Sequence, residues 1–174
     1  MAMMATSLFL FGQSDNIDPG AEVGKLSFLE GQWKGSGWMI GPDRKKVSFI
    51  QTEDVSFAVS GRVLLVKGLG KTRDPETGEE MVIHDALAMI TFNPKDDHYD
   101  FRSYVAGRGA GNHYGLWVKE NHFEWFLETP NGKIRYTITL NDQGQWYEIG
   151  EFDTGGSWVK FFEMTLDKRT AENN

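Results

Sequence analysis

Short apolar runs, separated by turn sequences, dominate the chain from Gln32 to Leu166. The separating segments are rich in Gly, Asn and Asp and recur at roughly ten-residue spacing, as is typical of successive β-strands. All five prolines lie in these segments or before the first run, where a strand loses no hydrogen bond. The pattern predicts ten strands, at residues 32–40, 45–57, 62–71, 81–92, 98–105, 112–119, 122–128, 133–140, 145–152 and 157–167.

Several of these strands alternate between apolar and polar residues, and the alternation indicates which face points into the core. In 133–140 every second residue is isoleucine, tyrosine or leucine, and the intervening residues are lysine, arginine or threonine. Similar alternation runs through 45–57 and 122–128. The segments 81–92 and 157–167 carry apolar residues on both faces, so the pattern leaves their inward face open.

A single short helix is predicted at residues 21–30, where Leu26, Phe28 and Leu29 form an apolar face and Gly31 ends the segment. The connections between the strands are too short for parallel crossovers, so neighbouring strands must be antiparallel. Ten sequential antiparallel strands leave two unpaired edges unless the sheet closes. We therefore predict an all-β fold, a single up-and-down antiparallel β-barrel of about ten strands with one short N-terminal helix. A two-sheet sandwich is the alternative.

Composition narrows the classes of partner. The 174 residues include 18 basic and 25 acidic side chains, a formal net charge of −7, which argues against a nucleic-acid partner. The absence of cysteine excludes disulfides, thiolate metal sites and a cysteine nucleophile. No run of about eighteen apolar residues is present, so no membrane-spanning helix is expected.

The chain divides into three parts. Residues 1–20 are interpreted as an N-terminal extension or the remnant of a signal peptide, because an apolar stretch without basic residues precedes small polar ones. Residues 21–168 form the predicted barrel, and 169–174 form a polar tail. An export signal at the N-terminus favours a periplasmic or secreted protein over a cytoplasmic one.

The segment Leu29–Gly37, with the sequence LEGQWKGSG, resembles the Gly-x-Trp-x-Gly-x-Gly signature that opens the first strand of nitrobindin-like and other lipocalin-like (calycin) proteins. Together with 49–55 and 158–166, it makes the chain most similar to an uncharacterised bacterial family of lipocalin-like barrels, distantly similar to nitrobindin and fatty-acid-binding proteins. Its glycines would let the strand bend at the closure, and Trp33 would plug one end of the barrel. The resemblance implies carriage of a small hydrophobic molecule.

The same resemblance raises haem binding, because nitrobindin-like barrels hold haem through a histidine near the C-terminal strands. The four histidines here are His84, His98, His113 and His122, and the last three predicted strands contain none. Haem binding is therefore the less favoured alternative, and no cofactor is predicted. No histidine spacing indicates a metal site, so no metal is predicted either.

Polar side chains recur on strands whose other residues are apolar. Gln51 and Glu53 lie on the inward face of the second strand. Arg102 and Tyr104 share a face of the fifth strand, and Glu148 lies on the ninth. A buried carboxylate is costly unless it is paired, so these residues form either a structural Arg–Glu network or the polar end of a ligand site. The residues predicted to bind a ligand are Phe49, Gln51, Glu53, Phe101, Arg102, Tyr104, Trp117, Trp125, Tyr136 and Glu148.

The favoured function is binding of a small hydrophobic or amphipathic molecule in the lumen, since ten strands enclose more space than the eight that already hold one small ligand. The alternative is a cavity enzyme of the lyase, isomerase or hydratase type. Its candidate catalytic residues are Glu53, whose pKa desolvation would raise, with His84 or Tyr104 as partner. A binding protein is favoured over an enzyme, because no second catalytic group is fixed by spacing.

Association is a separate question from the lumen. Outward apolar residues on 81–92 and 157–167, among them Phe161 and Val159, would face water unless something covers them. A helix of ten residues is only about 15 Å long and covers part of the wall. We therefore predict a homodimer packed wall to wall. The alternative is a monomer whose outer face is masked by the helix and the N-terminal segment.

Overall fold

The computed structural model of the chain describes residues 17–170. The elements, in chain order, are α1 (Pro19–Gly24), the 3-10 helix η1 (Ser27–Leu29), β1 (Gly31–Ile40), β2 (Lys46–Ala58), β3 (Val63–Arg73), β4 (Glu80–Asn93), β5 (His98–Val105), β6 (Gly109–Lys119), β7 (His122–Thr129), β8 (Gly132–Leu140), β9 (Trp146–Asp153) and β10 (Trp158–Lys168). All ten predicted strands are present, and each bound lies within three residues of its predicted position. The apolar stretch interpreted as a signal peptide lies outside the described residues.

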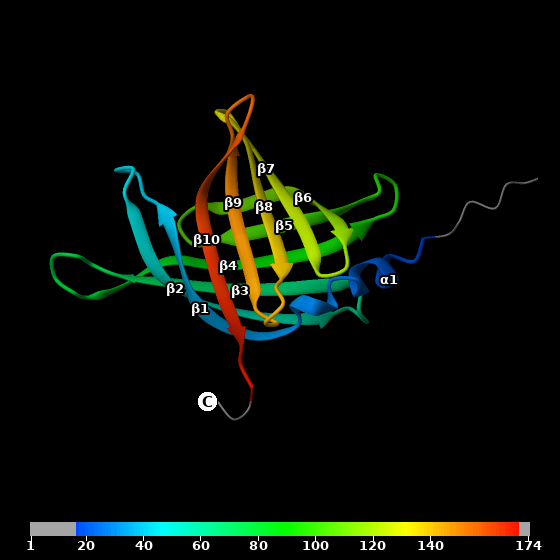
Figure 1. Cartoon of the computed structure of the whole chain (residues 1–174). Coiled ribbons are helices and arrows are strands. Elements are labelled where there is room, and N and C mark those ends of the chain that lie inside the picture. The colour runs from blue at the N-terminus through cyan, green and yellow to red at the C-terminus, as the bar shows by residue number, and fades with distance from the viewer. Residues whose placement is uncertain (1–16, 171–174) are drawn as a thin grey trace, which may run out of the picture.

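The ten strands form one closed antiparallel barrel (Figure 1). Each strand pairs with its neighbours in the chain, and β1 closes the sheet by pairing with both β2 and β10. The predicted up-and-down barrel is confirmed, and the alternative two-sheet sandwich is not formed. Closure leaves no edge strand, so every strand finds two hydrogen-bonding partners.

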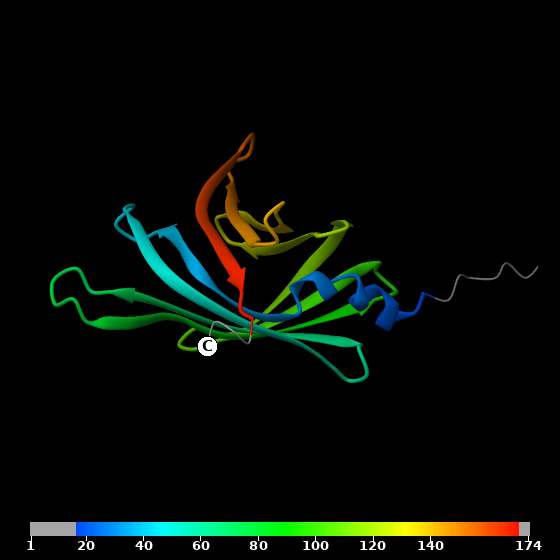
Figure 2. The same cartoon turned by 60° about the horizontal axis from the view of Figure 1, so that its bottom comes forward.

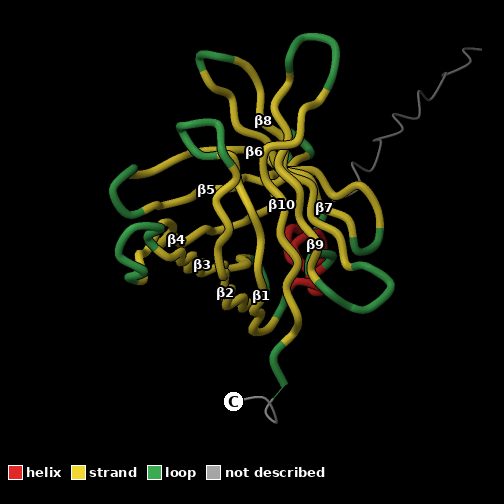
Figure 3. The backbone as a smooth tube through the Cα atoms, turned by 60° about the vertical axis from the view of Figure 1, so that its left-hand side comes forward, coloured by secondary structure: helices red, strands yellow, loops and turns green. Residues whose placement is uncertain are grey.

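The barrel has two distinct ends. Figure 1 shows α1 beside one end, which we call the closed end, where the β2–β3, β4–β5, β6–β7 and β8–β9 connections also lie. The other five hairpin connections, including β5–β6, lie at the opposite end, which we call the open end. Figures 2 and 3 show the same arrangement from two further sides.

The helix is shorter than the segment 21–30 predicted from the sequence. Asp18 caps α1 by accepting a hydrogen bond from the Gly20 backbone N–H at 3.0 Å, and the chain tightens into η1 after Gly24. Because of this break, both Leu26 and Leu29 turn into the barrel and are fully buried. No helix in the described part of the chain is long and apolar enough to cross a membrane.

Tryptophan and tyrosine side chains fix the closed end. Trp33 is 1% exposed, and its indole N–H donates to the backbone oxygen of Leu29 at 2.8 Å. The ring of Trp33 also packs edge to face against Trp146, with centroids 5.9 Å apart. The Tyr99 hydroxyl donates to the backbone oxygen of Glu22 in α1 at 2.9 Å. The closed end is therefore a packed core with Trp33 as its plug, as the sequence indicated.

The glycine-rich start of β1 serves the closure of the barrel. A Cβ on Gly35 would lie 2.0 Å from the backbone oxygen of Thr165 in β10. No side chain fits at that distance, so β1 and β10 can approach only because this position is glycine.

The strand register shows which faces of β4 and β10 point into the barrel, which the sequence pattern did not decide. On β4, Ala88 and Ile90 are buried in the barrel, whereas Leu87 and Met89 are 38% and 44% exposed on its outer face. On β10, a register shift between Lys160 and Phe162 turns Phe161 toward the lumen side, where its ring meets that of Tyr136. The prediction that Phe161 faces outward is therefore wrong, because a β-bulge interrupts the alternation.

Candidate functional site

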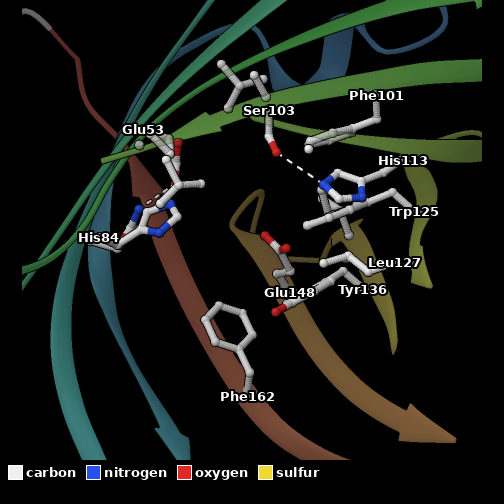
Figure 4. Close-up of a pocket in the computed structure, with 18 of the residues that line it drawn as sticks. Glu53, His84, Phe101, Ser103, His113, Trp125, Leu127, Tyr136, Glu148 and Phe162 are labelled. Carbon is white, nitrogen blue, oxygen red and sulfur yellow. Dashed lines mark hydrogen bonds between the residues drawn. The ribbon is translucent and has the colours of Figure 1, made fainter. Parts of the chain in front are cut away.

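The lumen holds a cavity of about 350 Å³ between the closed-end core and the open end. All ten strands contribute to its lining, from Met39 on β1 to Met164 on β10. Leu29 and Trp146 line it at the closed end, and Arg108 on the β5–β6 connection lines it at the open end. The volume falls in the range of pockets that hold small molecules, about 300–1,000 Å³. Figure 4 shows the labelled side chains around this space.

One side of the cavity is a stack of three aromatic rings, which we call the aromatic wall: Phe101, Trp125 and Tyr136. The ring centroids of Phe101 and Trp125 are 4.4 Å apart, and those of Trp125 and Tyr136 are 4.3 Å apart, with the planes within 9° of parallel. Tyr136 lies against Gly150 on β9, where a Cβ would come within 2.8 Å of its ring. The wall offers a continuous apolar surface to a ligand.

Glu53 is the first of two buried carboxyl groups in the cavity. It is only 7% exposed and accepts a hydrogen bond from Gln51 Nε2 at 2.6 Å. Its second oxygen, Oε2, has no hydrogen-bond partner in the described part of the chain. Burial raises the pKa of Glu53 from 4.5 to about 7, and the hydrogen bond from Gln51 offsets part of that rise. The group therefore titrates close to neutral pH.

Glu148 is the second buried carboxyl group. It is 6% exposed and accepts a hydrogen bond from the Trp146 indole N–H at 3.0 Å. Burial and, to a smaller extent, the negative charge of Glu53 raise its pKa to about 8, while hydrogen bonds from Trp146 and Trp125 offset part of that rise. The pKa values of the two carboxyl groups are thus linked, and ionisation of one disfavours ionisation of the other.

Two histidines also line the cavity. Burial lowers the pKa of both His84 and His113, and the charge of Arg108 lowers that of His84 further. His113 Nε2 lies 3.1 Å from the hydroxyl oxygen of Ser103 (Figure 4). Both imidazoles are therefore neutral at neutral pH and add hydrogen-bonding groups without charge. The described residues contain no cluster of three or more His, Asp or Glu side chains that could hold a metal ion.

The structure places most of the predicted site residues around the cavity. Those that line it are Phe49, Gln51, Glu53, His84, Phe101, Trp125, Tyr136 and Glu148. Those that do not are Arg102, Tyr104 and Trp117.

Arg102 and Tyr104 lie on the outer face of β5, so the prediction that they face the lumen is wrong. Phe101 is buried inside the barrel, and successive residues of a strand point to opposite faces. Arg102 accordingly lies on the outside, 3.9 Å from Asp100, and Tyr104 is 66% exposed. Of the two alternatives for these polar residues, the structural Arg–Glu network is not formed, since no ion pair among residues 17–170 includes a lumenal carboxylate.

Trp117 lies at the closed end, outside the lumen. It is 36% exposed and sits near α1, with the ammonium of Lys25 4.9 Å from its ring centroid. Its position opposite the fully buried Phe123 places it at the end of β6, beyond the cavity. The prediction that Trp117 lines the lumen is wrong, because face alone does not give a residue's height along the barrel.

Many lining residues were not among the predicted ligand-binding residues, and three of them show why. Ser103 follows Phe101 by two positions, so its inward direction was accessible from alternation. Arg108 lies in a hairpin loop, where alternation carries no information. Phe162 follows the bulge on β10, which shifts the phase of the strand.

The fold and the cavity together define a closed ten-stranded antiparallel β-barrel with an internal cavity. No family model matches the sequence, and no curated protein matches it. Among solved structures, the crystal structure of Rv2717c from M. tuberculosis is similar, with a TM-score of 0.61 and 12% identity over 89% of this chain and 100% of that one. The S-type phycobiliprotein lyase CPES from Guillardia theta is similar with a TM-score of 0.57 and 7% identity, over 88% and 94% of the two chains. At these identities the likeness establishes the fold alone.

Proposed function

We propose that the protein binds a small hydrophobic or amphipathic molecule in the barrel lumen. The observation that carries this proposal is the cavity of about 350 Å³, with an aromatic wall on one side and two buried carboxyl groups. Protein interiors are normally close-packed, and a volume of this size is larger than a stable core requires. A mostly apolar cavity with a few polar groups is the usual form of a small-molecule site.

The similarity to other barrels supports the proposal by analogy of fold. One similar barrel is named as an S-type phycobiliprotein lyase. We further propose kinship with an uncharacterised bacterial family of lipocalin-like barrels, distantly similar to nitrobindin and fatty-acid-binding proteins, on the basis of the signature at Leu29–Gly37. That kinship favours carriage of a hydrophobic molecule as the role of the lumen.

A cavity-filling substitution tests the proposal. Ala88 lines the cavity, while its neighbour Met89 points outward, so Ala88→Phe and Met89→Phe place an aromatic ring on opposite faces of β4. The probe is N-phenyl-1-naphthylamine, a neutral dye that fluoresces in apolar surroundings. We expect the wild-type protein and Met89→Phe to bind the dye alike, and Ala88→Phe to bind it about tenfold or more weakly.

Circular dichroism of both variants establishes that they are folded. Native mass spectrometry of the freshly purified wild-type protein identifies any small molecule that remains bound to it. The proposal is wrong if the wild-type protein does not bind the dye. It is equally wrong if folded Ala88→Phe binds the dye as tightly as Met89→Phe does.

The second candidate function is proton transfer within the same cavity. The observation that favours it is the pair of carboxyl groups with pKa values of about 7 and about 8, which is the range suited to general acid–base catalysis near neutral pH. His84 lines the cavity and is the candidate partner of Glu53, whereas Tyr104 is excluded by its outward position.

Isotope exchange separates this candidate from simple binding. The molecule recovered from wild-type protein after incubation in D₂O should carry deuterium at a carbon-bound position, and the Glu53→Gln variant should not introduce it. Recovery of an unlabelled molecule from the wild-type protein would leave binding as the function and remove catalysis.

A further inference from the structure

The two buried carboxyl groups lack a counter-charge within the protein. Glu53 on β2 and Glu148 on β9 both line the cavity, and β1 and β10 lie between these strands in the wall. The hydrogen bonds that they accept come from Gln51, Trp146 and Trp125, which are neutral donors. No ion pair found in the described part of the chain includes either group. Oε2 of Glu53, a side chain more than nine-tenths buried, has no partner there at all.

The other charged and titratable side chains of the cavity do not supply that counter-charge. Besides the two carboxyl groups, those found in the described residues are His84, His113, Tyr136 and Arg108. Burial lowers the pKa of the two histidines, which are neutral at neutral pH, and it raises the pKa of Tyr136, which stays protonated. Arg108 is exposed at the open end and is in no ion pair with either carboxylate in the described part of the chain. Where these carboxyl groups ionise, no cation of the described lining pairs with them, so a cationic ligand would supply their counter-charge.

We propose that the lumen is selective for small organic cations, with the ammonium group of the ligand bound between Glu53 and Glu148 and its apolar body against the aromatic wall. This proposal rests on the proposed function, since it names the class of molecule that the lumen binds. An ammonium group satisfies the unpartnered Glu53 oxygen by donating a hydrogen bond, and it neutralises carboxylates that are costly to bury alone.

The same arrangement disfavours ligands with an anionic head. A fatty-acid carboxylate placed at this site would add a third acidic group beside two that already hinder each other's ionisation. It could bind only with all three carboxyl groups protonated or with its head turned toward Arg108 at the open end. Ligands with the same chain and different heads should therefore bind in the order amine, alcohol, carboxylate.

Competition against a bound dye measures this order directly. N-phenyl-1-naphthylamine is first bound to the wild-type protein and then displaced by decylamine, decanol or decanoate, which differ only in the head group. We expect decylamine to compete about tenfold or more strongly than decanol at about pH 8, with decanoate the weakest. In Glu53→Gln and Glu148→Gln the advantage of decylamine over decanol should fall toward unity.

The matched control is Glu128→Gln. Glu128 is an exposed carboxyl on β7 whose partner is Lys133 at 3.5 Å, so its replacement should keep the wild-type order of binding, amine before alcohol before carboxylate.

The pH dependence of the competition gives a test that needs no variant. Between about pH 6 and pH 8 the two carboxyl groups gain negative charge and the histidines lose any positive charge, while decylamine stays protonated. Its advantage over decanol should therefore grow with pH.

The outcomes separate the two proposals. Failure of the dye to bind the wild-type protein overturns the proposed function, and the cation site falls with it. Dye binding with decanoate competing as well as decylamine overturns the cation site alone, as does an amine advantage that is unchanged in both lumenal glutamine variants. Should one of these variants not fold, the other variant and the wild-type pH series decide the question.

Discussion

Replacing Glu148 with glutamine tests the electrostatic description of the cavity through stability alone. Burial and the charge of Glu53 raise the pKa of Glu148 from 4.5 to about 8 in the folded chain. The folded protein therefore holds this proton more tightly than the unfolded chain does. The sign follows from proton linkage: the free energy of unfolding has its full value where Glu148 is protonated in both states, and it declines as pH rises from about 4.5 to about 8.

The size of the decline follows from the size of the pKa change. At about 1.36 kcal/mol for each pH unit, a rise from 4.5 to about 8 corresponds to a loss of at most about 5 kcal/mol. Part of that loss belongs to the repulsion between Glu148 and Glu53, and water entering the cavity reduces it further. A loss of about 2–5 kcal/mol is a large share of the stability of a domain, about 5–15 kcal/mol.

Glutamine removes the charge and keeps the shape. Its side-chain oxygen can still accept the hydrogen bond from the Trp146 indole N–H, which is 3.0 Å long in the wild-type protein. We expect Glu148→Gln to match the wild-type protein in stability at about pH 5 and to exceed it by about 2–5 kcal/mol at about pH 9. The variant should also ease the ionisation of Glu53, since the neighbouring carboxylate is gone.

Urea denaturation followed by tryptophan fluorescence, repeated at intervals from about pH 5 to about pH 9, measures the difference. The control is Glu128→Gln, an exposed carboxyl on the outer surface, which should change stability by less than about 1 kcal/mol at every pH. A stability difference between wild type and Glu148→Gln that stays constant with pH would show that Glu148 titrates at its ordinary pKa and that burial does not raise it.

Three further predictions concern packing and association. Gly150→Ala should lower the free energy of unfolding by about 1–3 kcal/mol, because its Cβ would lie 2.8 Å from the Tyr136 ring; an unchanged melting temperature would contradict that close approach. Trp33→Phe should lower the free energy of unfolding, measured by urea denaturation, by about 1–4 kcal/mol, because it removes the 2.8 Å hydrogen bond to Leu29 and part of the side chain that plugs the closed end. An unchanged free energy of unfolding would contradict the role of Trp33 as a plug. We also expect a homodimer through the outer faces of β4 and β5, where Tyr104 is 66% exposed. Tyr104→Glu should therefore reduce the mass measured by light scattering to that of one chain, 19.7 kDa. A wild-type protein that already has a mass of 19.7 kDa would exclude the dimer.

The strands were predictable because their signals are local. Prolines and turn residues mark where ladder hydrogen bonds stop, and alternation gives the inward face wherever one side of a strand is polar. On β8, for example, the alternate apolar residues predict the inward position of Tyr136, which lines the cavity. The helix was less predictable, because its break after Gly24 depends on how Leu26 and Leu29 enter the closed end.

The residues of the site were predictable only where alternation was unbroken. On β2 it placed Phe49, Gln51 and Glu53 in the lumen, and the structure has them there. On β10 the bulge beside Phe161 changes the phase, and a bulge has no clear signal in a single sequence. The height of a residue in the barrel depends on the register of all ten strands, which is a long-range property.

The indole N–H resonances of the tryptophans show whether the lumen is the ligand site. Trp125 and Trp146 line the cavity, whereas Trp38 and Trp158 lie outside it against Lys46 and Arg135. In a ¹⁵N-labelled sample titrated with N-phenyl-1-naphthylamine, we expect the Trp125 and Trp146 resonances to shift with the dye while those of Trp38 and Trp158 stay in place. Shifts confined to the outer pair, with the lumenal pair unmoved, would contradict a lumenal ligand site.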